Sequence, residues 1–189
     1  LTERIETADD KEQAIMQASG IVSKMPDKRI ALQVLEQALA SQVDQLPIAR
    51  MALADAAWAA SDSDRALLEA RAAQQLDPNS EPAAQRVLEY GQNVDPAAVI
   101  AQTEHWLDTH PAARKLRLML VARLVERDEY DRALEHIERM REQQPEDFDL
   151  LYSEAEIQFR AGHNARAREL LNEYISVQTQ RRQSLDDSV

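Results

Sequence analysis

A spacing of about 34 residues recurs along most of this 189-residue chain and restricts its fold more than any other feature. Three segments end in proline, and Pro78, Pro111 and Pro145 are separated by 33 (111 − 78) and 34 (145 − 111) residues. A second marker, a small residue inside an apolar stretch, has a mean spacing of 34 ((167 − 31)/4) at Ala31, Ala66, Ala98, Ala133 and Ala167. Two markers that keep this spacing indicate a repeat architecture in which each repeat packs on its neighbours.

Each repeat contains two apolar stretches of helical periodicity, separated by a polar turn. In the fourth repeat, Leu116, Leu120 and Leu124 share one helical face, and a polar segment at 126–129 follows. The next face carries Tyr130, Ala133, Leu134, Ile137 and Met140. Because proline cannot continue the hydrogen-bond ladder of a helix, the repeated prolines mark where each second helix ends. The repeat is therefore a helix–turn–helix hairpin, and the predicted fold class is all-α.

Composition favours closely packed helices and excludes several classes of function. The chain is 44% hydrophobic, mostly Ala and Leu, with 4% aromatic residues and 3 Gly. The net charge of −12 (22 − 34) would repel nucleic acid, so we expect no nucleic-acid partner. The absence of Cys excludes disulfides and thiolate metal sites. No apolar run approaches the roughly 20 residues of a membrane span, so we expect no direct membrane insertion of this segment.

Residues at fixed places in these repeats resemble the tetratricopeptide repeat (TPR) family. The second repeat matches the family pattern at Leu53, Ala54, Ala57, Ser61, Asp62, Ala66, Ala70, Ala73 and Pro78. The fourth matches it at Leu120, Val121, Leu124, Asp128, Tyr130, Ala133, Ile137, Met140 and Pro145, and the fifth at Leu151, Ala155, Gly162, Ala167, Leu171 and Tyr174. The resemblance implies a right-handed superhelical solenoid of about five helix–turn–helix hairpins.

The resemblance also sets the expected boundaries. We expect a TPR array over 12–178, preceded by an N-terminal lead-in or capping segment at 1–11 and followed by a polar tail or linker at 179–189. Within it, the units are expected near 12–46, 47–79, 80–113, 114–147 and 148–178. The third unit departs from the pattern, because Arg86 stands where Leu is expected and Gly91 falls inside the first helix. A local distortion is therefore predicted near 91–93.

In this family the first helices line a concave groove. The residues of this chain at the groove positions are Met51, Asp55, Trp58, Leu118, Ala122, Val125, Tyr152, Glu156, Phe159 and Arg160. One interpretation is that Trp58, Tyr152 and Phe159 anchor a partner helix or extended peptide, while the acids select cations of the partner. The alternative is that these side chains pack against other helices, since apolar stripes at helical spacing are typical of a core.

The best-known peptide-binding device of the family is a carboxylate clamp, which uses Lys and Asn at two of these groove positions. This chain has Met51 and Asp55 at the corresponding places of the second unit, and Leu118 and Ala122 in the fourth. The clamp is absent. We therefore do not expect an adaptor for the C-terminal tails of chaperones.

No arrangement of residues predicts catalysis. His105 and His110 lie five residues apart and so do not share a helix face, and a solvated surface explains Glu104 and Asp108 beside His105. The sequence has no glycine-rich phosphate loop and no motif around a nucleophilic serine. We expect no enzyme activity, no cofactor and no metal ion.

The last predicted helix, near 165–179, has an apolar face that nothing after it covers. Its apolar residues are Leu170, Leu171, Tyr174, Ile175 and Val177. Either more repeats follow in a longer parent protein, or the chain self-associates through this end. We favour the first, because the chain begins at Leu1 without an initiator Met and resembles fragments of long multi-repeat TPR proteins of Gram-negative bacteria. We expect a soluble segment, periplasmic or in the cell envelope if a signal or lipid anchor precedes it, and otherwise cytoplasmic.

The leading hypothesis is a protein-interaction scaffold or adaptor that binds a partner protein, helix or peptide in its groove. One alternative is a structural spacer or self-association module within a larger protein. A second alternative is a regulatory repeat domain of an enzyme.

Overall fold

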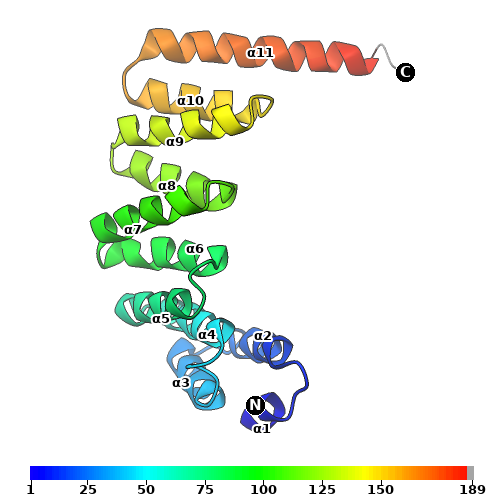
Figure 1. Cartoon of the computed structure of the whole chain (residues 1–189), viewed down its shortest axis with the longest axis vertical. Helices are drawn as coiled ribbons and strands as arrows, with labels where there is room; N and C mark the ends of the chain where they lie inside the picture. Colours follow the sequence, from blue (N-terminus) through cyan, green and yellow to red (C-terminus); the bar gives the residue numbers. More distant parts are fainter. Residues whose placement is uncertain (187–189) are drawn as a thin grey trace. The chain divides into compact units, whose positions relative to one another are not determined.

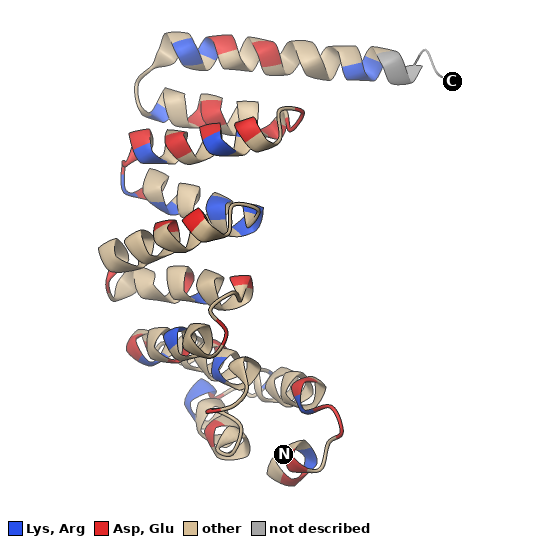
Figure 2. Ribbon diagram, in the orientation of Figure 1, with Lys and Arg blue, Asp and Glu red and all other residues tan. Residues whose placement is uncertain are grey.

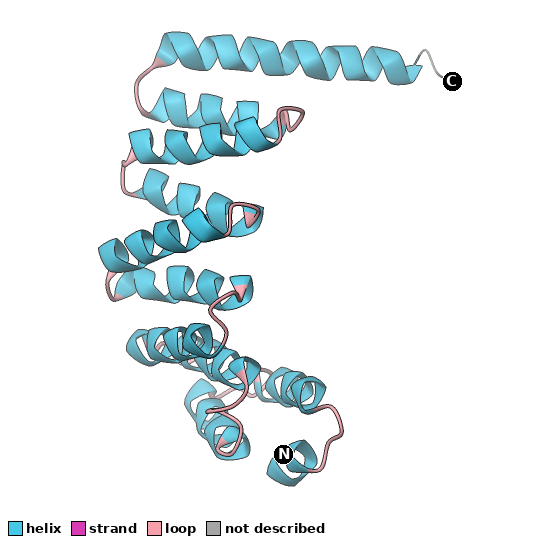
Figure 3. Ribbon diagram, in the orientation of Figure 1, coloured by secondary structure: helices cyan, strands magenta, loops and turns pink. Residues whose placement is uncertain are grey.

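The computed structural model describes the backbone of residues 1–186 and the side chains of residues 1–183 (Figure 1). Over residues 1–186 it contains eleven α-helices and one 3-10 helix, and no strand (Figure 3). The all-α fold class predicted from the two helical stretches of each repeat is confirmed. Acidic and basic residues are interspersed along these helices rather than gathered in one block (Figure 2).

The chain divides into two compact units, unit 1 at Leu1–Leu116 and unit 2 at Arg117–Val189. The boundary falls inside α8 (Arg114–Glu126), so each unit holds part of this helix. The other helices of unit 1 are α1 (Thr2–Glu6), α2 (Lys11–Val22), α3 (Lys28–Leu39), α4 (Pro47–Ala59), α5 (Ser63–Leu76), α6 (Glu81–Tyr90), η1 (Gly91–Asn93) and α7 (Pro96–Thr109). Those of unit 2 are α9 (Tyr130–Gln143), α10 (Asp149–Arg160) and α11 (Asn164–Asp186).

Several helices of unit 1 begin where a side chain caps their free backbone N–H groups. The side-chain oxygens of Asp10, Asp27, Asp62, Ser80 and Asp95 accept hydrogen bonds from N–H groups two or three residues further along. In α4 and α7 a proline, Pro47 or Pro96, occupies the first helical position, where no N–H is needed. The helix starts are thus specified locally by the sequence.

Alanine makes up much of the buried surface of α4 and α5, two helices that pack against each other in unit 1. The buried alanines of these two helices are Ala49, Ala52, Ala54, Ala57, Ala66, Ala70 and Ala73. Their small side chains allow the two helix backbones to approach closely while burying apolar surface. Larger side chains, among them Leu35, Leu39 and Leu53, fill the space toward α2 and α3.

The predicted distortion at 91–93 is confirmed, and α7 lies in close contact with the backbone there. After α6 the chain forms the 3-10 turn η1, and α7 follows at once. A Cβ atom on Gly91 would lie 2.2 Å from Cγ1 of Val99, well inside contact distance. Gly91 is therefore required because α7 passes directly against the backbone at this point.

The first and second helices of three hairpins are joined by the same turn. The residue that leaves the helix, Ser61, Asp128 or Gly162, has a positive φ of 62°, 59° or 84°. In each turn its N–H bonds to a carbonyl three residues back, and the next N–H bonds to one five residues back, at 2.9 Å from Asp62 to Ala57. This pair of bonds defines a Schellman motif, in which the left-handed residue reverses the chain.

Unit 2 packs α10 against both α9 and α11. Its buried apolar residues include Leu120, Leu124, Ile137, Leu151 and Leu170. The helix α11 continues to Asp186, beyond the end near 179 that the sequence suggested, so residues 179–186 of the expected polar tail are helical. The guanidinium of Arg181 lies 4.6 Å from the centre of the Phe148 ring, a cation–π contact that favours this extension. The last part of that expected tail, 187–189, lies outside the described residues.

Candidate functional site

The described residues contain no group of three or more His, Cys, Asp or Glu side chains that could hold a metal ion. Among the helices of that range, none combines the length and apolar character that crossing a membrane requires. The sequence placed ten residues in a groove. The structure divides them into three groups with different surroundings.

The first group, on α4 in unit 1, contacts side chains from α6. The carboxylate of Asp55 accepts hydrogen bonds from Nε and Nη2 of Arg86, at 2.6 and 2.7 Å. It also accepts one from the hydroxyl of Tyr90, at 2.6 Å. A bidentate guanidinium and a phenol thus surround the acid that the sequence interpretation assigned to a partner's cation.

The aromatic and thioether members of this group are engaged in the same way. The rings of Trp58 and Tyr90 are stacked, with centroids 4.9 Å apart and planes inclined by 21°. Nη1 of Arg86 lies 3.7 Å from the sulfur of Met51. We call these five residues, Met51, Asp55, Trp58, Arg86 and Tyr90, the α4–α6 contact.

The contact also shifts the acid–base properties of its members. Hydrogen bonding to Asp55 raises the pKa of Arg86 above its ordinary value, although burial acts in the opposite direction. Burial and the hydrogen bond to Asp55 raise the pKa of Tyr90 well above its ordinary value near 10. The guanidinium therefore stays charged and the phenol stays neutral.

Sequence reasoning missed Arg86 and Tyr90 as partners of these residues. A signal was present, since Arg86 departs from the family pattern at a position where Leu is expected. A charged residue on that face requires a counter-charge nearby, and Asp55 on the preceding first helix supplies it.

The second group lines a single pocket in unit 2, between α8 and α10. It consists of Leu118, Ala122, Val125, Glu156 and Arg160. The cavity measures about 300 Å³, and its other lining residues are Val121, Glu126, Ile137, Ser153 and Ile157. We call this cavity the α8–α10 pocket.

The charged residues of the α8–α10 pocket are paired. Glu126 accepts from Nη1 of Arg123 at 2.8 Å, and Glu156 accepts from Nη2 of Arg160 at 2.8 Å. The remaining lining is aliphatic apart from Ser153. The pocket thus combines an apolar wall with two ion pairs, an arrangement suited to binding an apolar side chain rather than to proton transfer.

The third group, Tyr152 and Phe159 on α10, does not line the pocket. Tyr152 is 51% exposed, and its ring lies 5.8 Å from that of Tyr174 on α11. Phe159 is 65% exposed, the largest exposed fraction among the large apolar side chains of the described residues. These two aromatic residues form a separate exposed surface on unit 2.

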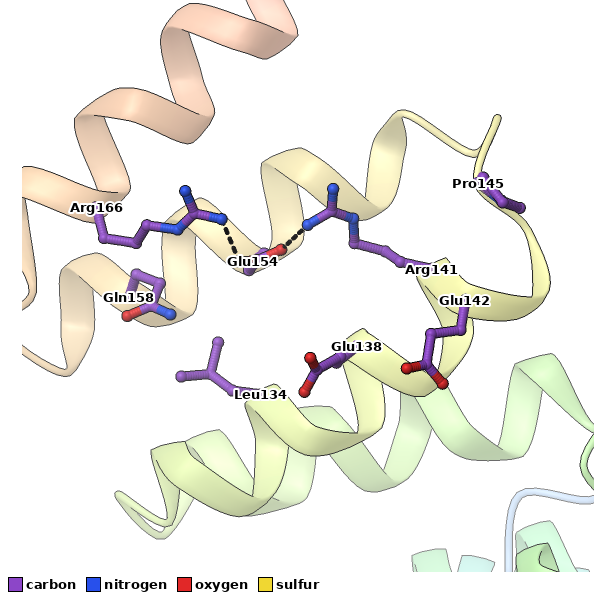
Figure 4. A pocket seen from close by; sticks show the side chains of 8 residues that line it. All are labelled: Leu134, Glu138, Arg141, Glu142, Pro145, Glu154, Gln158 and Arg166. Carbon is purple, nitrogen blue, oxygen red and sulfur yellow. Dashed lines mark hydrogen bonds and ion pairs between the residues drawn. The ribbon is translucent and has the colours of Figure 1, made fainter.

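A larger hollow of about 490 Å³ in unit 2 is polar (Figure 4). Arg141 of α9 and Arg166 of α11 both point toward the carboxylate of Glu154 on α10 in this view, and both pair with it. The Glu154 side chain is only 13% exposed. These two ion pairs join α9, α10 and α11 through Glu154, which gives this part of the hollow a structural role.

Comparison with known proteins agrees with this geometry. Two models of the tetratricopeptide repeat match residues 25–81 and 124–185, more than half of the chain between them. No curated protein matches the sequence.

Solved structures share the fold at low sequence identity. MamA from Desulfovibrio magneticus RS-1 aligns with a TM-score of 0.64 and 16% identity, over 90% of this chain and 97% of that one. YrrB, described as a TPR protein with an unusual peptide-binding site, aligns with a TM-score of 0.61 and 14% identity, over 99% and 96% of the two chains. PilW, a type IV pilus biogenesis factor, aligns with a TM-score of 0.62 and 19% identity, over 89% and 78%. Together with the two repeat matches, the hairpins and their turns show that this chain belongs to the tetratricopeptide repeat family.

Proposed function

We propose that this chain is a protein-interaction scaffold that holds a segment of a partner protein in the α8–α10 pocket. The family supports an interaction role in general, because tetratricopeptide repeats present side chains of stacked helices to other polypeptides. YrrB, which shares the fold, is described as having a peptide-binding site. The observation that carries the proposal is that five groove residues of unit 2 surround an open cavity, whereas those of α4 contact Arg86 and Tyr90 of α6.

A paired substitution tests this function. Ala122 lies in the pocket and is exposed, so Ala122→Arg would fill the cavity without disturbing the core. Ala165→Arg on α11 is the matched control, because Ala165 is also exposed and does not line the pocket. Proteins captured from an extract of the source organism would be quantified by mass spectrometry for wild type and both variants.

We expect a specific partner to be captured at least about tenfold less by Ala122→Arg, a loss of about 1.4 kcal/mol in binding, and unchanged by Ala165→Arg. Circular dichroism would confirm that both variants fold. Equal capture by all three proteins would overturn the pocket as the binding site.

A second candidate function, self-association, is favoured by exposed apolar side chains on α10 and α11. Tyr152, Phe159, Leu171 and Ile175 are 51%, 65%, 37% and 59% exposed. Burying such side chains between two copies would remove apolar surface from water. Sedimentation of the wild-type chain and of Phe159→Asp over a range of concentrations tests this role, and a wild type that stays monomeric throughout would exclude it.

A further inference from the structure

The two groove regions are related by one constant shift along the chain. Met51, Asp55 and Trp58 on α4 correspond to Leu118, Ala122 and Val125 on α8, each 67 residues later (118 − 51, 122 − 55, 125 − 58). The same shift relates Arg86 and Tyr90 on α6 to Ser153 and Ile157 on α10 (153 − 86, 157 − 90). It also superimposes the buried positions, since Ala83, Ala84 and Leu88 correspond to Leu150, Leu151 and Ala155. The α4–α6 contact and the α8–α10 pocket are therefore the same site in two repeats.

The side chains that fill this site in unit 1 are replaced by smaller ones in unit 2. Trp58 and Tyr90, which stack on each other, are replaced by Val125 and Ile157. Both replacements line the pocket, whose volume of about 300 Å³ lies at the lower end of the range for small-molecule sites. The cavity in unit 2 thus occupies the place that an indole and a phenol ring fill in unit 1.

The charged pair of the first site, Asp55 and Arg86, has no counterpart in unit 2. Asp55 becomes Ala122 and Arg86 becomes Ser153, so neither the acid nor the cation of the first site remains. The two carboxylates that line the pocket, Glu126 and Glu156, are paired with Arg123 and Arg160. The pocket therefore offers apolar walls with balanced charge, which favour an uncharged apolar occupant over an ion.

We propose that the α8–α10 pocket binds the aromatic side chain of a Trp or Tyr residue presented by a partner polypeptide. The partner's ring takes the place that the chain's own Trp58 and Tyr90 fill in unit 1. Aromatic rings bury a large apolar area with few rotatable bonds, and for this reason they anchor many protein interfaces. This inference rests on the proposed function and specifies the chemistry of the partner.

The pocket is suited to a direct binding test with the full chain. The probe is N-acetyl-L-tryptophanamide, an uncharged mimic of a tryptophan residue, and N-acetyl-L-leucinamide is the aliphatic comparison. Methyl NMR would follow Leu118, Val121, Val125, Ile137 and Ile157, which carry methyl groups on the pocket wall. We expect saturable shifts confined to these residues, with a Kd on the order of 1 mM, as is usual for a ligand of this size. The leucine compound is expected to bind at least about fivefold more weakly.

Restoring the composition of unit 1 provides the decisive variant. Val125→Trp with Ile157→Tyr places the first site's two rings in the second site, and binding of the tryptophan probe should fall at least about tenfold. Ala165→Trp is the control, since Ala165 is exposed on α11 and outside the pocket, and it should leave binding unchanged. If the double variant does not fold, Ala122→Trp fills the same cavity from an exposed position.

Three outcomes overturn the proposal: no saturable shift of the pocket methyls, equal affinity for the leucine compound, or binding that survives in the filled variants. The proposed function is tested separately, by the capture experiment with Ala122→Arg and Ala165→Arg. If the tryptophan probe does not bind but Ala122→Arg still abolishes partner capture, the pocket is a binding site for a different chemistry.

Discussion

Arg86 closes the site on α4 by holding both carboxylate oxygens of Asp55 with two of its guanidinium nitrogens. The side chains of Arg86 and Asp55 are 27% and 40% exposed, so the pair is partly shielded from solvent. Replacing Arg86 by Met keeps a long apolar stem and removes the charge. We expect Arg86→Met to lower the free energy of unfolding by about 1–3 kcal/mol, because Asp55 then loses its charge-assisted hydrogen bonds. Urea denaturation measures this change.

A double-mutant cycle separates the pair from the loss of either side chain. Asp55→Asn alone should also destabilise the protein, and the two changes together should cost less than the sum of the two single changes. An interaction energy of about 1 kcal/mol or more is expected for residues in direct contact. Strict additivity would show that the two hydrogen bonds contribute nothing to stability.

Tyr90 predicts a loss of stability in alkaline solution. Its pKa is raised because burial and the hydrogen bond to Asp55 favour the neutral phenol. Below about pH 10 the phenol carries its proton in both the folded and the unfolded chain, so it contributes no pH dependence. Above that pH the unfolded chain releases the proton and the folded chain retains it, and stability falls as pH rises. Ionisation of Tyr90 in the unfolded chain should lower the free energy of unfolding by about 1 kcal/mol between pH 10 and pH 11.

Tyr90→Phe is the control for this effect. The variant lacks the ionisable group but retains the ring that stacks on Trp58. Its free energy of unfolding, measured by urea at pH 9, 10 and 11, should decline less steeply than that of the wild type. Equal slopes would mean that Tyr90 ionises in the folded protein as readily as in the unfolded one.

The hairpins could be predicted from the sequence because their signals are local. Each repeat carries its own markers: a proline after the second helix, and a small residue such as Ala66 or Ala133 within that helix. Both markers depend only on residues of the same repeat, and their recurrence every 33 or 34 residues makes them visible in the sequence. The length of α11 was underestimated, because the Arg181–Phe148 contact joins residues that lie 33 apart (181 − 148). Contacts of this kind leave no periodic trace.

The state of the groove could not be predicted in the same way. Whether Trp58 is covered depends on Tyr90, which lies in the least regular repeat, 32 residues further on (90 − 58). The family pattern gives the position of a groove residue but not the size of the side chain opposite it. That size, large at Tyr90 and small at Ile157, distinguishes the filled site from the open one.

Gly91→Ala is expected to be destabilising although alanine normally favours helical backbone. The added Cβ would lie 2.2 Å from Cγ1 of Val99, so η1 and α7 must move apart, at a cost of about 1–3 kcal/mol. Gly20→Ala is the matched control, because Gly20 lies inside α2 and a Cβ added to it would have no atom within 4 Å. This change should stabilise the protein by about 0.5–1 kcal/mol. Thermal unfolding compares the two, and a stable Gly91→Ala would disprove the close contact.

Glu69 and Asp44 pair with the same arginine but differ in burial. We therefore expect replacement of the two carboxylates to lower the free energy of unfolding by different amounts. Arg50 donates to Glu69 at 2.8 Å and to Asp44 at 2.6 Å, and the two carboxylate side chains are 1% and 84% exposed. Glu69 also accepts from Arg65 at 2.6 Å. Glu69→Gln should therefore cost about 2 kcal/mol, since it weakens a buried network, whereas Asp44→Asn should change stability by less than about 0.5 kcal/mol. Urea denaturation of the two variants would contradict this view if their losses were similar.

At the Schellman turns of two repeats, we expect substitutions in opposite directions to change stability in opposite directions. Ser61 adopts a φ of 62° although it carries a Cβ, and Gly162 adopts a φ of 84° at the equivalent turn. A Cβ added to Gly162 would have no atom within 4 Å, so only the backbone conformation opposes a side chain there. Left-handed backbone is costly for a side chain and free for glycine. We expect Ser61→Gly to stabilise the chain by about 0.5–1 kcal/mol and Gly162→Ala to destabilise it by about 1 kcal/mol, measured by thermal unfolding. If both variants were more stable than the wild type, or both less stable, the backbone conformation at these turns would not explain the effect of the substitutions.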